Sequence, residues 1–203
     1  MRTIMRNVPS VFKARAPASA CACDNRALPN VPRNLPDAPP MPEARTRKPP
    51  TTRSKPAYAV RHSPIHGRGV FATRTIRKGA DIIEYRGRRI SVEEADELPD
   101  SDPDNPFHTF LFELNDGRVI DAGVRGNAAR WINHSCQPNC VPYENDEGRV
   151  IIEAKRTIRA GEELSYDYKL NVPGRRSARL LANYACRCGA PRCRGSMVDP
   201  RKK

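Results

Sequence analysis

The chain has 203 residues and a formal net charge of +13, and 20 of its residues are proline. This length allows one ordinary domain with additional segments. No apolar run approaches the roughly 18 residues that a membrane-spanning helix needs, and the N-terminus lacks the apolar segment of a secretory signal, so we expect neither a membrane protein nor a secreted one.

Residues 1–56 form the first distinct region of the chain. They contain eleven prolines, eleven basic residues and only three acids. Such a composition buries little apolar surface, so we expect a disordered tail. The tail could tether the protein to nucleic acid, or it could be a solvated linker, and translation from Met41 would remove most of it.

Short apolar runs separated by Gly and Pro begin at Tyr58 and predict small β-sheets. Strands are expected at 58–61 and 70–72, with a loop over residues 63–69. Residues 74–85 and 156–166 are two copies of a local repeat. Each copy is expected to contain the end of one strand, a turn at a Gly and a second strand that ends in Tyr.

Residues 91–106 carry seven acids and no base, against the basic background of the chain. Ser91 and Glu94 have the spacing of a capping box, so a short helix is expected over 91–98, followed by a loop over 100–106. The acidic run is either a solvated face or part of a surface for a basic partner. Further along the chain, the turn signals predict hairpins over 109–122 and 141–154 and a short helix over 177–184.

The stretch Asn127–Cys140, NAARWINHSCQPNC, combines a polar pair, a thiol and a forced turn. Asn133 and His134 are adjacent polar residues, Cys136 is a candidate metal ligand, and Pro138 ends any helix. This combination indicates a site. Two other stretches accompany it, HGRGVFA at 66–72 and GEELSYDY at 161–168, and CRCGAPRC follows at 186–193.

In this order and spacing, these motifs resemble the SET-domain protein lysine methyltransferases, in particular the trithorax and mixed-lineage-type branch with a cysteine-rich post-SET segment. The resemblance covers residues 58 to about 195. It implies a mostly-β SET fold (β-clip) of several small sheets and short helices with a knot-like core. The implied organisation is a tail over 1–56, a SET domain over 57–171 and a post-SET segment over 182–198.

The resemblance also implies a site for S-adenosylmethionine. The residues that match its adenine- and methionine-binding positions are His66, Gly67, Arg68, Gly69, Asn133 and His134. The two glycines would allow the backbone to approach the cofactor closely. Phe110 falls where relatives often place a cofactor-contacting Tyr, so the ring is kept and the hydroxyl is lost.

Three tyrosines match the family's lysine channel. Tyr168 matches the catalytic Tyr, Tyr166 the position where Tyr limits the product to monomethyl-lysine, and Tyr85 the opposite channel wall. Methyl transfer to an amine needs alignment more than acid–base power, and a poorly hydrated aromatic channel favours the neutral amine that must react. The alternative for each tyrosine is a core aromatic residue on a strand.

The seven cysteines favour metal binding over disulfides. Cys186, Cys188 and Cys193 form a tight group, and an odd total count suits metal in a reducing compartment, which indicates the cytoplasm, nucleus or nucleoid. Structural zinc takes four ligands, so Cys136 is expected to be the fourth. Cys140 is expected to be a small buried residue, and Cys21 and Cys23 to be free thiols.

The implied function is S-adenosylmethionine-dependent N-methylation of lysine in a basic protein such as a histone. One alternative is a non-catalytic, zinc-stabilised SET scaffold bound to DNA or chromatin. Another is methylation of a non-histone substrate such as a ribosomal protein. The oligomeric state is left open by the sequence.

Overall fold

The computed structural model describes residues 5–6, 55–99, 109–172 and 176–200. The chain divides into two compact units. Residues 1–11 and 56–203 form one unit, and residues 12–55 form the other, of which only Lys55 is described. All described strands and helices belong to the first unit.

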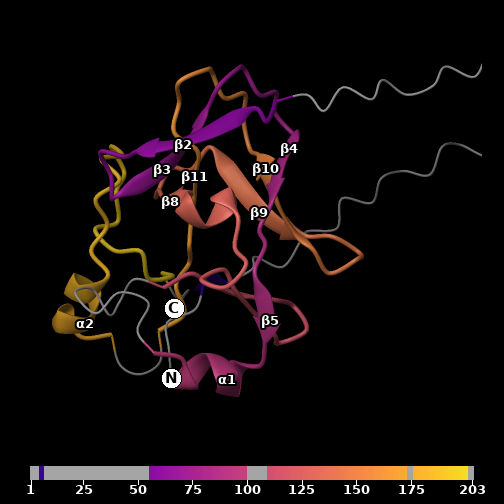
Figure 1. Ribbon diagram of the computed structural model, residues 1–203. Helices are drawn as coiled ribbons and strands as arrows, with labels where there is room; N and C mark the ends of the chain where they lie inside the picture. The colour runs from indigo at the N-terminus through magenta and orange to yellow at the C-terminus, as the bar shows by residue number, and fades with distance from the viewer. Residues whose placement is uncertain (1–4, 7–54, 100–108, 173–175, 201–203) are drawn as a thin grey trace, which may run out of the picture. The chain divides into compact units, whose positions relative to one another are not determined.

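Within the described ranges, eleven short strands and three short helical segments form the first unit (Figure 1). The strands are β1 (Met5–Arg6), β2 (Tyr58–His62), β3 (Arg68–Ala72), β4 (Asp81–Glu84), β5 (Arg88–Ile90), β6 (Leu111–Glu113), β7 (Val119–Asp121), β8 (Asn133–His134), β9 (Cys140–Glu144), β10 (Val150–Ala154) and β11 (Ser165–Tyr166). The helical segments are α1 (Val92–Glu97), the 3₁₀ turn η1 (Ala128–Trp131) and α2 (Ala178–Asn183).

The strands pair into several small sheets, which confirms the predicted mostly-β fold with short helices. In the described part of the chain the sheet orders are β1-β6-β7-β5, β4-β10-β9, β11-β8 and β2-β3. Both predicted hairpins are present, as β6–β7 and β9–β10. The threading of a knot-like core stays a prediction.

The β2–β3 hairpin is longer than the sequence indicated. Its antiparallel register runs from Tyr58 opposite Ala72 to His62 opposite Arg68. Arg68 and Gly69, expected in a loop, therefore lie in β3, because the ladder continues past the apolar residues that marked the strand. The connecting loop is reduced to residues 63–67.

The two sequence repeats contact each other at equivalent positions. Ile76 of the first copy and Ile158 of the second form an antiparallel bridge, with reciprocal backbone N–H···O distances of 2.8 and 2.9 Å. Gly79 and Gly161 then turn the chain with φ of +79° and +88°, a conformation that glycine adopts without strain. The turn of the first copy leads into β4, which ends before Tyr85, and the turn of the second copy leads into β11, which contains Tyr166.

Strands β8 and β11 bring the two central motifs together. They pair in parallel, with Ser165 opposite Asn133 and Tyr166 opposite His134. Ile132, just before β8, and Leu164, just before β11, are both fully buried. Apolar burial beside each short strand holds the polar motif residues in register.

Both predicted helices are present, as α1 and α2, and each begins at a serine N-cap, of which only Ser91 was predicted. The Ser91 hydroxyl accepts a hydrogen bond from the Glu94 backbone N–H at 3.1 Å, and the Ser177 hydroxyl accepts one from Leu180 N–H at 3.1 Å. Each bond satisfies an amide that lacks a partner within the helix. The loop expected over 100–106 lies outside the described residues.

The C-terminal segment folds back onto the residues around Leu170. Leu170 forms a parallel bridge with Val198, and Ala185 forms an antiparallel bridge with Ser196. Val198 and Tyr184 are buried in the core. The segment expected over 182–198 therefore packs against the residues that follow Tyr168. None of the helices in the described ranges has both the length and the apolar character required to cross a membrane.

The first residues of the chain also contribute to a sheet. Strand β1 pairs in parallel with β6, with Met5 opposite Phe112 and Arg6 opposite Glu113. Met5 is only 3% exposed, so burial of its apolar side chain accompanies the pairing. The tail expected to be disordered thus contains a short strand, and the rest of residues 1–54 lies outside the described residues.

Candidate active site and cysteine cluster

The carboxamide of Asn133 connects three segments of the chain. Its Nδ2 donates hydrogen bonds to the Arg68 carbonyl at 2.9 Å, the Glu163 carboxylate at 2.7 Å and, more weakly, the His66 carbonyl at 3.4 Å. Asn133 is buried at the start of β8. It therefore ties the loop of residues 63–67 and the start of β3 to the centre of the fold.

Glu163 completes this connection, and sequence reasoning assigned it no role. Its two carboxylate oxygens accept hydrogen bonds from the Ser63 hydroxyl at 2.8 and 2.9 Å. A Cβ on Gly69 would lie 2.3 Å from the Glu163 Oε1 atom. The group that approaches Gly69 closely is therefore the Glu163 carboxylate, which a Cβ at this position would displace. The only sequence signal was its place within the 161–168 motif, where a neighbouring acid, Glu162, looks the same.

His134 is held as a neutral imidazole by burial and by two hydrogen bonds. Its Nδ1 accepts the Tyr168 backbone N–H at 3.1 Å, and its Nε2 lies 3.4 Å from the Cys136 sulfur. Burial lowers the pKa of His134 to about 4, against an opposing effect of Asp167. Since Nδ1 accepts, the proton of the neutral ring belongs on Nε2, which then donates to the sulfur.

A cavity of about 430 Å³ opens beside these residues. Three of the seven predicted cofactor residues line it, namely His66, Asn133 and His134, together with Tyr168. Residues of the C-terminal segment form another part of the lining, which includes Ala182, Asn183, Ala185, Cys186, Arg187 and Met197. A cavity of this volume suits a small organic cofactor.

The other four predicted cofactor residues do not line this cavity. Gly67 sits in the hairpin loop with φ of +44°, and Arg68 and Gly69 are in β3. Arg68 lies over the Trp131 ring, with its guanidinium carbon 5.1 Å from the ring centroid. Phe110 packs edge-on against Trp131 at 5.2 Å.

Trp131, to which the sequence analysis assigned no role, is in contact with two cations. Besides Arg68, the Arg130 guanidinium carbon lies 4.6 Å from the Trp131 centroid and 5.4 Å from that of Phe110. Stacked guanidinium groups and aromatic rings attract one another electrostatically. The cluster stiffens the segment that leads from η1 into β8.

The three predicted channel tyrosines, Tyr85, Tyr166 and Tyr168, lie together in one cluster, the tyrosine cage. The rings of Tyr166 and Tyr168 are 5.0 Å apart, and Phe112 contacts both Tyr85, at 5.2 Å, and Tyr166, at 6.4 Å. Tyr85 and Tyr166 are almost fully buried. Burial raises the pKa of all three hydroxyls, so they stay neutral phenols at physiological pH.

Each tyrosine hydroxyl has a defined partner. Tyr168 donates to the Ile132 carbonyl at 2.8 Å, and Tyr85 donates to the Phe110 carbonyl at 3.1 Å. The Tyr166 hydroxyl lies 3.1 Å from the Met5 sulfur. These contacts fix the ring orientations, which a positioning role requires.

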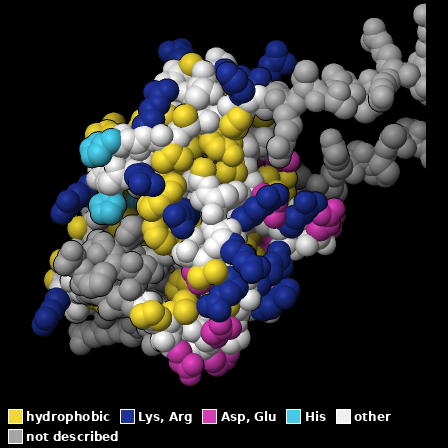
Figure 2. All heavy atoms as spheres, viewed as in Figure 1, with side chains coloured by type: hydrophobic (Ala, Val, Ile, Leu, Met, Phe, Trp, Pro, Cys, Tyr) yellow, Lys and Arg dark blue, Asp and Glu magenta, His cyan; other side chains and the backbone are white. Residues whose placement is uncertain are grey.

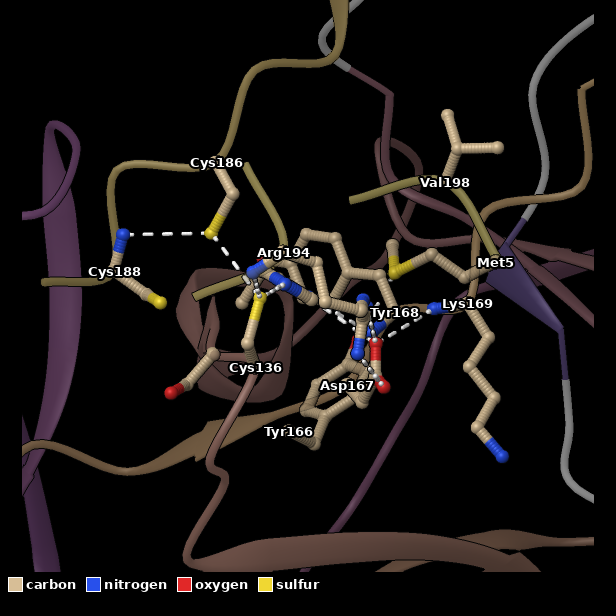
Figure 3. Close-up of polar contacts among 12 residues, drawn as sticks. Met5, Cys136, Tyr166, Asp167, Tyr168, Lys169, Cys186, Cys188, Arg194 and Val198 are labelled. Carbon is tan, nitrogen blue, oxygen red and sulfur yellow. Dashed lines mark hydrogen bonds and ion pairs between the residues drawn. The ribbon is translucent and has the colours of Figure 1, made fainter. Parts of the chain in front are cut away.

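The four predicted metal ligands converge, and their ligand atoms all lie within 4.8 Å of one another. The Cys136 sulfur is 3.7 Å from that of Cys186 and 3.9 Å from that of Cys193. Figure 3 shows the sulfurs of Cys136 and Cys186 facing each other. Zinc–sulfur bonds of about 2.3 Å in a tetrahedron place sulfurs about 3.8 Å apart. The cluster could therefore hold zinc, and its distances are too long for a disulfide.

The thiols of the cluster differ in how readily they lose a proton. Burial raises the pKa of Cys136 and Cys186, so these two stay protonated at neutral pH without a cation. Burial acts on Cys188 in the same direction, but hydrogen bonds from backbone amides and neighbouring thiols outweigh it and lower its pKa to about 6. Cys188 is thus a ready thiolate, and a divalent cation would deprotonate the others on binding.

Cys140 does not belong to this cluster. It lies at the start of β9 and is 1% exposed. Burial raises its pKa to about 12, so its thiol stays protonated. It is the small buried residue that was expected.

A salt bridge beside the cluster was not foreseen from the sequence. The Arg194 guanidinium pairs with both oxygens of Asp167, at 2.7 and 2.8 Å, while the Arg194 backbone N–H donates to the Cys136 sulfur at 3.4 Å (Figure 3). Asp167 lies between the two motif tyrosines. The C-terminal segment is thus joined to the tyrosine cage by an ion pair as well as by the cysteines.

Known proteins are similar in sequence to most of the chain. The family model described as SET domain matches residues 67–169. The chain is 40% identical over 147 residues to the human protein named histone-lysine N-methyltransferase 2B, and the match covers 70% of the chain and 5% of the relative.

Two proteins of Drosophila melanogaster are similar over the same region. Histone-lysine N-methyltransferase trr is 43% identical over 135 residues, and histone-lysine N-methyltransferase trithorax is 38% identical over 143. These matches cover 65% and 69% of the chain but only 5% and 4% of the relatives. They confirm the trithorax-type resemblance of the motifs.

Proposed function

Because the chain belongs to the SET domain family, we propose that it is an S-adenosylmethionine-dependent protein-lysine N-methyltransferase. The observation that carries the proposal is the cavity in which His66, Asn133 and His134 line the same space as Tyr168. This arrangement sets the predicted cofactor residues beside the predicted lysine channel. The relatives' names, histone-lysine N-methyltransferases, support a histone or histone-like basic protein as substrate.

The residues of the chain would act by positioning and by exclusion of water. S-adenosylmethionine supplies an electrophilic methyl group on its sulfonium. An acceptor lysine must arrive neutral, which costs about 4–5 kcal/mol at pH 7 from a normal pKa. The cage formed by the buried Tyr85 and Tyr166 and the partly buried Tyr168 would offset this cost by disfavouring the charged ammonium.

The tyrosine hydroxyls would orient the amine without accepting its proton. Their pKa values are raised by burial, so none is ionised at neutral pH. The Tyr168 hydroxyl donates a hydrogen bond to the Ile132 carbonyl. The lone pairs of its oxygen therefore stay free to accept a hydrogen bond from the substrate amine. The ammonium proton would leave to solvent before transfer.

We assign one zinc ion to Cys136, Cys186, Cys188 and Cys193. The sulfur spacing and the ready thiolate of Cys188 support it. The ion would be structural, since four cysteines fill its coordination sphere. Nucleic-acid binding by residues 1–56 stays a prediction, because most of that segment lies outside the described residues.

The test is methyl transfer from isotope-labelled S-adenosylmethionine to purified histones and other basic proteins, followed by mass spectrometry of the modified lysines. Tyr168→Phe is the matched control. It should lower turnover by about 100-fold while cofactor affinity, measured by calorimetry, changes by less than about threefold. A wild-type protein that binds the cofactor but methylates none of these proteins would favour the non-catalytic scaffold.

A further inference from the structure

The N-terminal strand β1 occupies a place where an extended peptide could bind. It lies at the edge of the four-stranded sheet, parallel to β6. More than one hundred residues separate these strands in the chain, so no local turn enforces the pairing. Addition of a strand to a sheet edge is a common mode of peptide recognition, with the backbone providing affinity and side-chain pockets providing specificity.

The side chain of Met5 enters the tyrosine cage. Its sulfur lies 3.1 Å from the Tyr166 hydroxyl. Met5 also lines the cavity together with Tyr168, Asn133 and His134. The position where an acceptor lysine is expected is thus filled by a residue of the chain itself.

Methionine is well suited to fill a channel for neutral lysine. Both side chains are unbranched and flexible, and methionine is shorter by one atom. The methionine side chain has no nitrogen, so it has no ammonium proton to lose and cannot accept a methyl group there. The surrounding sequence, Arg2-Thr3-Ile4-Met5-Arg6-Asn7, is basic, and residues 1–11 contain no acid.

We infer that the segment around Met5–Arg6 is a built-in pseudosubstrate, which occupies the acceptor-lysine channel and the edge of β6 and must leave before a substrate can bind. This inference rests on the proposed function only in its identification of the channel. The occupancy itself is an observation of strand pairing, burial and the contact with Tyr166. The segment competes with substrate, so its release should lower KM and leave kcat unchanged.

The first experiment measures occupancy without any catalysis. Met5→Asp in the full chain places a carboxylate where the wild-type side chain is 3% exposed, so the strand should leave the cage. The control is Val60→Asp, because Val60 is 39% exposed in β2 and its carboxylate would be solvated. The probe is a fluorescein-labelled synthetic peptide with the sequence of residues 2–10.

Fluorescence anisotropy should show that Met5→Asp binds this peptide at least about tenfold more tightly than the wild type or Val60→Asp, since a tethered segment competes at high effective concentration. Replacing the methionine of the probe by aspartate should abolish the binding. Equal binding by all three proteins, or no binding to a folded Met5→Asp protein, would show that Met5 is only a core residue and would overturn the inference.

The second experiment converts the pseudosubstrate into a substrate. In Met5→Lys the amine would extend past the Tyr166 hydroxyl into the cavity that Tyr168 lines. After the new lysine ammonium loses its proton to solvent, the amine lone pair forms a bond to the methyl carbon of S-adenosylmethionine. The bond between this carbon and the sulfonium sulfur breaks, and its electron pair stays on sulfur. Peptide mapping should find methyl groups on residue 5, with a first-order rate that does not change across a hundredfold dilution of the protein.

The two proposals fail separately. If Met5→Lys stays unmodified while the same preparation methylates histone, the channel is not occupied as inferred and the pseudosubstrate is wrong. If neither residue 5 nor any added protein is methylated, the proposed function fails, and the peptide-binding result alone decides whether Met5–Arg6 occupies the channel.

Discussion

Single atoms in the tyrosine cage decide how much room a methylated amine would have. The hydroxyl of Tyr166 is fully enclosed, and it contacts the Met5 sulfur directly. Tyr168 and Tyr85 instead donate to backbone carbonyls. The partner of the Tyr166 hydroxyl is therefore a thioether, which is a weak acceptor, so this hydroxyl can be removed without leaving a carbonyl unpaired.

We predict that Tyr166→Phe shifts the product from monomethyl-lysine toward di- and trimethyl-lysine. Loss of the hydroxyl vacates space next to the amine, so a methylated lysine can turn and react again. Mass spectrometry of a histone substrate at matched total turnover would measure the distribution. An unchanged product distribution would show that Tyr166 does not control the degree of methylation.

Glu163 allows a second prediction at the residue scale. It accepts hydrogen bonds from Asn133 and Ser63 and thereby holds the loop before β3. Glu163→Ala should weaken S-adenosylmethionine binding by about tenfold, because the Asn133 amide and the loop lose their common partner. Calorimetric titration would measure the affinity. Glu163→Gln keeps an acceptor for Asn133 and should therefore retain most of the cofactor affinity. An equal loss of affinity in both variants would contradict the positioning role.

Among the elements, helix α1 carries the acidic surface that was noted in the sequence. Figure 2 shows acidic side chains gathered at the end of the molecule where α1 lies, next to Lys and Arg side chains. Glu94 pairs with Arg88 of β5 at 3.0 Å. The run is therefore partly balanced by a neighbouring strand, which the absence of bases within residues 91–106 had not indicated.

We predict that neutralising Glu93, Glu94, Asp96 and Glu97 with Gln or Asn raises KM for basic peptides by a few fold. Each exposed charge contributes little to binding, and the effect should shrink as salt screens the charges. Glu94→Gln alone is the control, since Glu94 already has a cationic partner. Peptide kinetics at low and high ionic strength would measure the rise in KM and its dependence on salt. If KM changes with neither the substitutions nor the salt, α1 is only a solvated face.

At the scale of the whole molecule, the C-terminal segment is attached to the SET region in three ways. The cysteines converge from positions fifty residues and more apart, Arg194 pairs with Asp167, and Leu170 bridges to Val198. Most strands precede this segment in the chain. Loss of the metal should consequently disturb the cavity wall more than it disturbs the core.

We predict close to one zinc per wild-type chain by elemental analysis. Cys188→Ser should lower kcat by about 100-fold, because small misplacements of aligned reactants are costly, while the melting temperature falls by only a few degrees (~1 kcal/mol). Cys140→Ala is the control, since Cys140 is buried outside the cluster, and it should retain full metal content. An active wild-type chain purified without metal would overturn the four-cysteine assignment.

Much of the fold followed from local sequence signals. The cap at Ser91, the hairpin turns and the repeated Gly turns each depend on residues near one another in the chain, and the structure contains them where they were expected. The four cysteines were grouped by their types and by their place in the resemblance. These features could be predicted because each requirement is met within a few residues or by a distinctive ligand chemistry.

The contacts that only the tertiary structure decided all join distant residues of ordinary type. Glu163 beneath Gly69, Asp167 with Arg194, and Trp131 between two arginines have no signature in the sequence, since a glutamate or an arginine there reads as a solvated charge. Met5 shows this most clearly. A methionine in a basic, proline-rich region gave no reason to expect burial, and its role depends on β6 and Tyr166, which lie more than one hundred residues away. Composition decides whether a segment can bury surface on its own, whereas a site formed by the rest of the chain can bind a single apolar side chain that composition does not reveal.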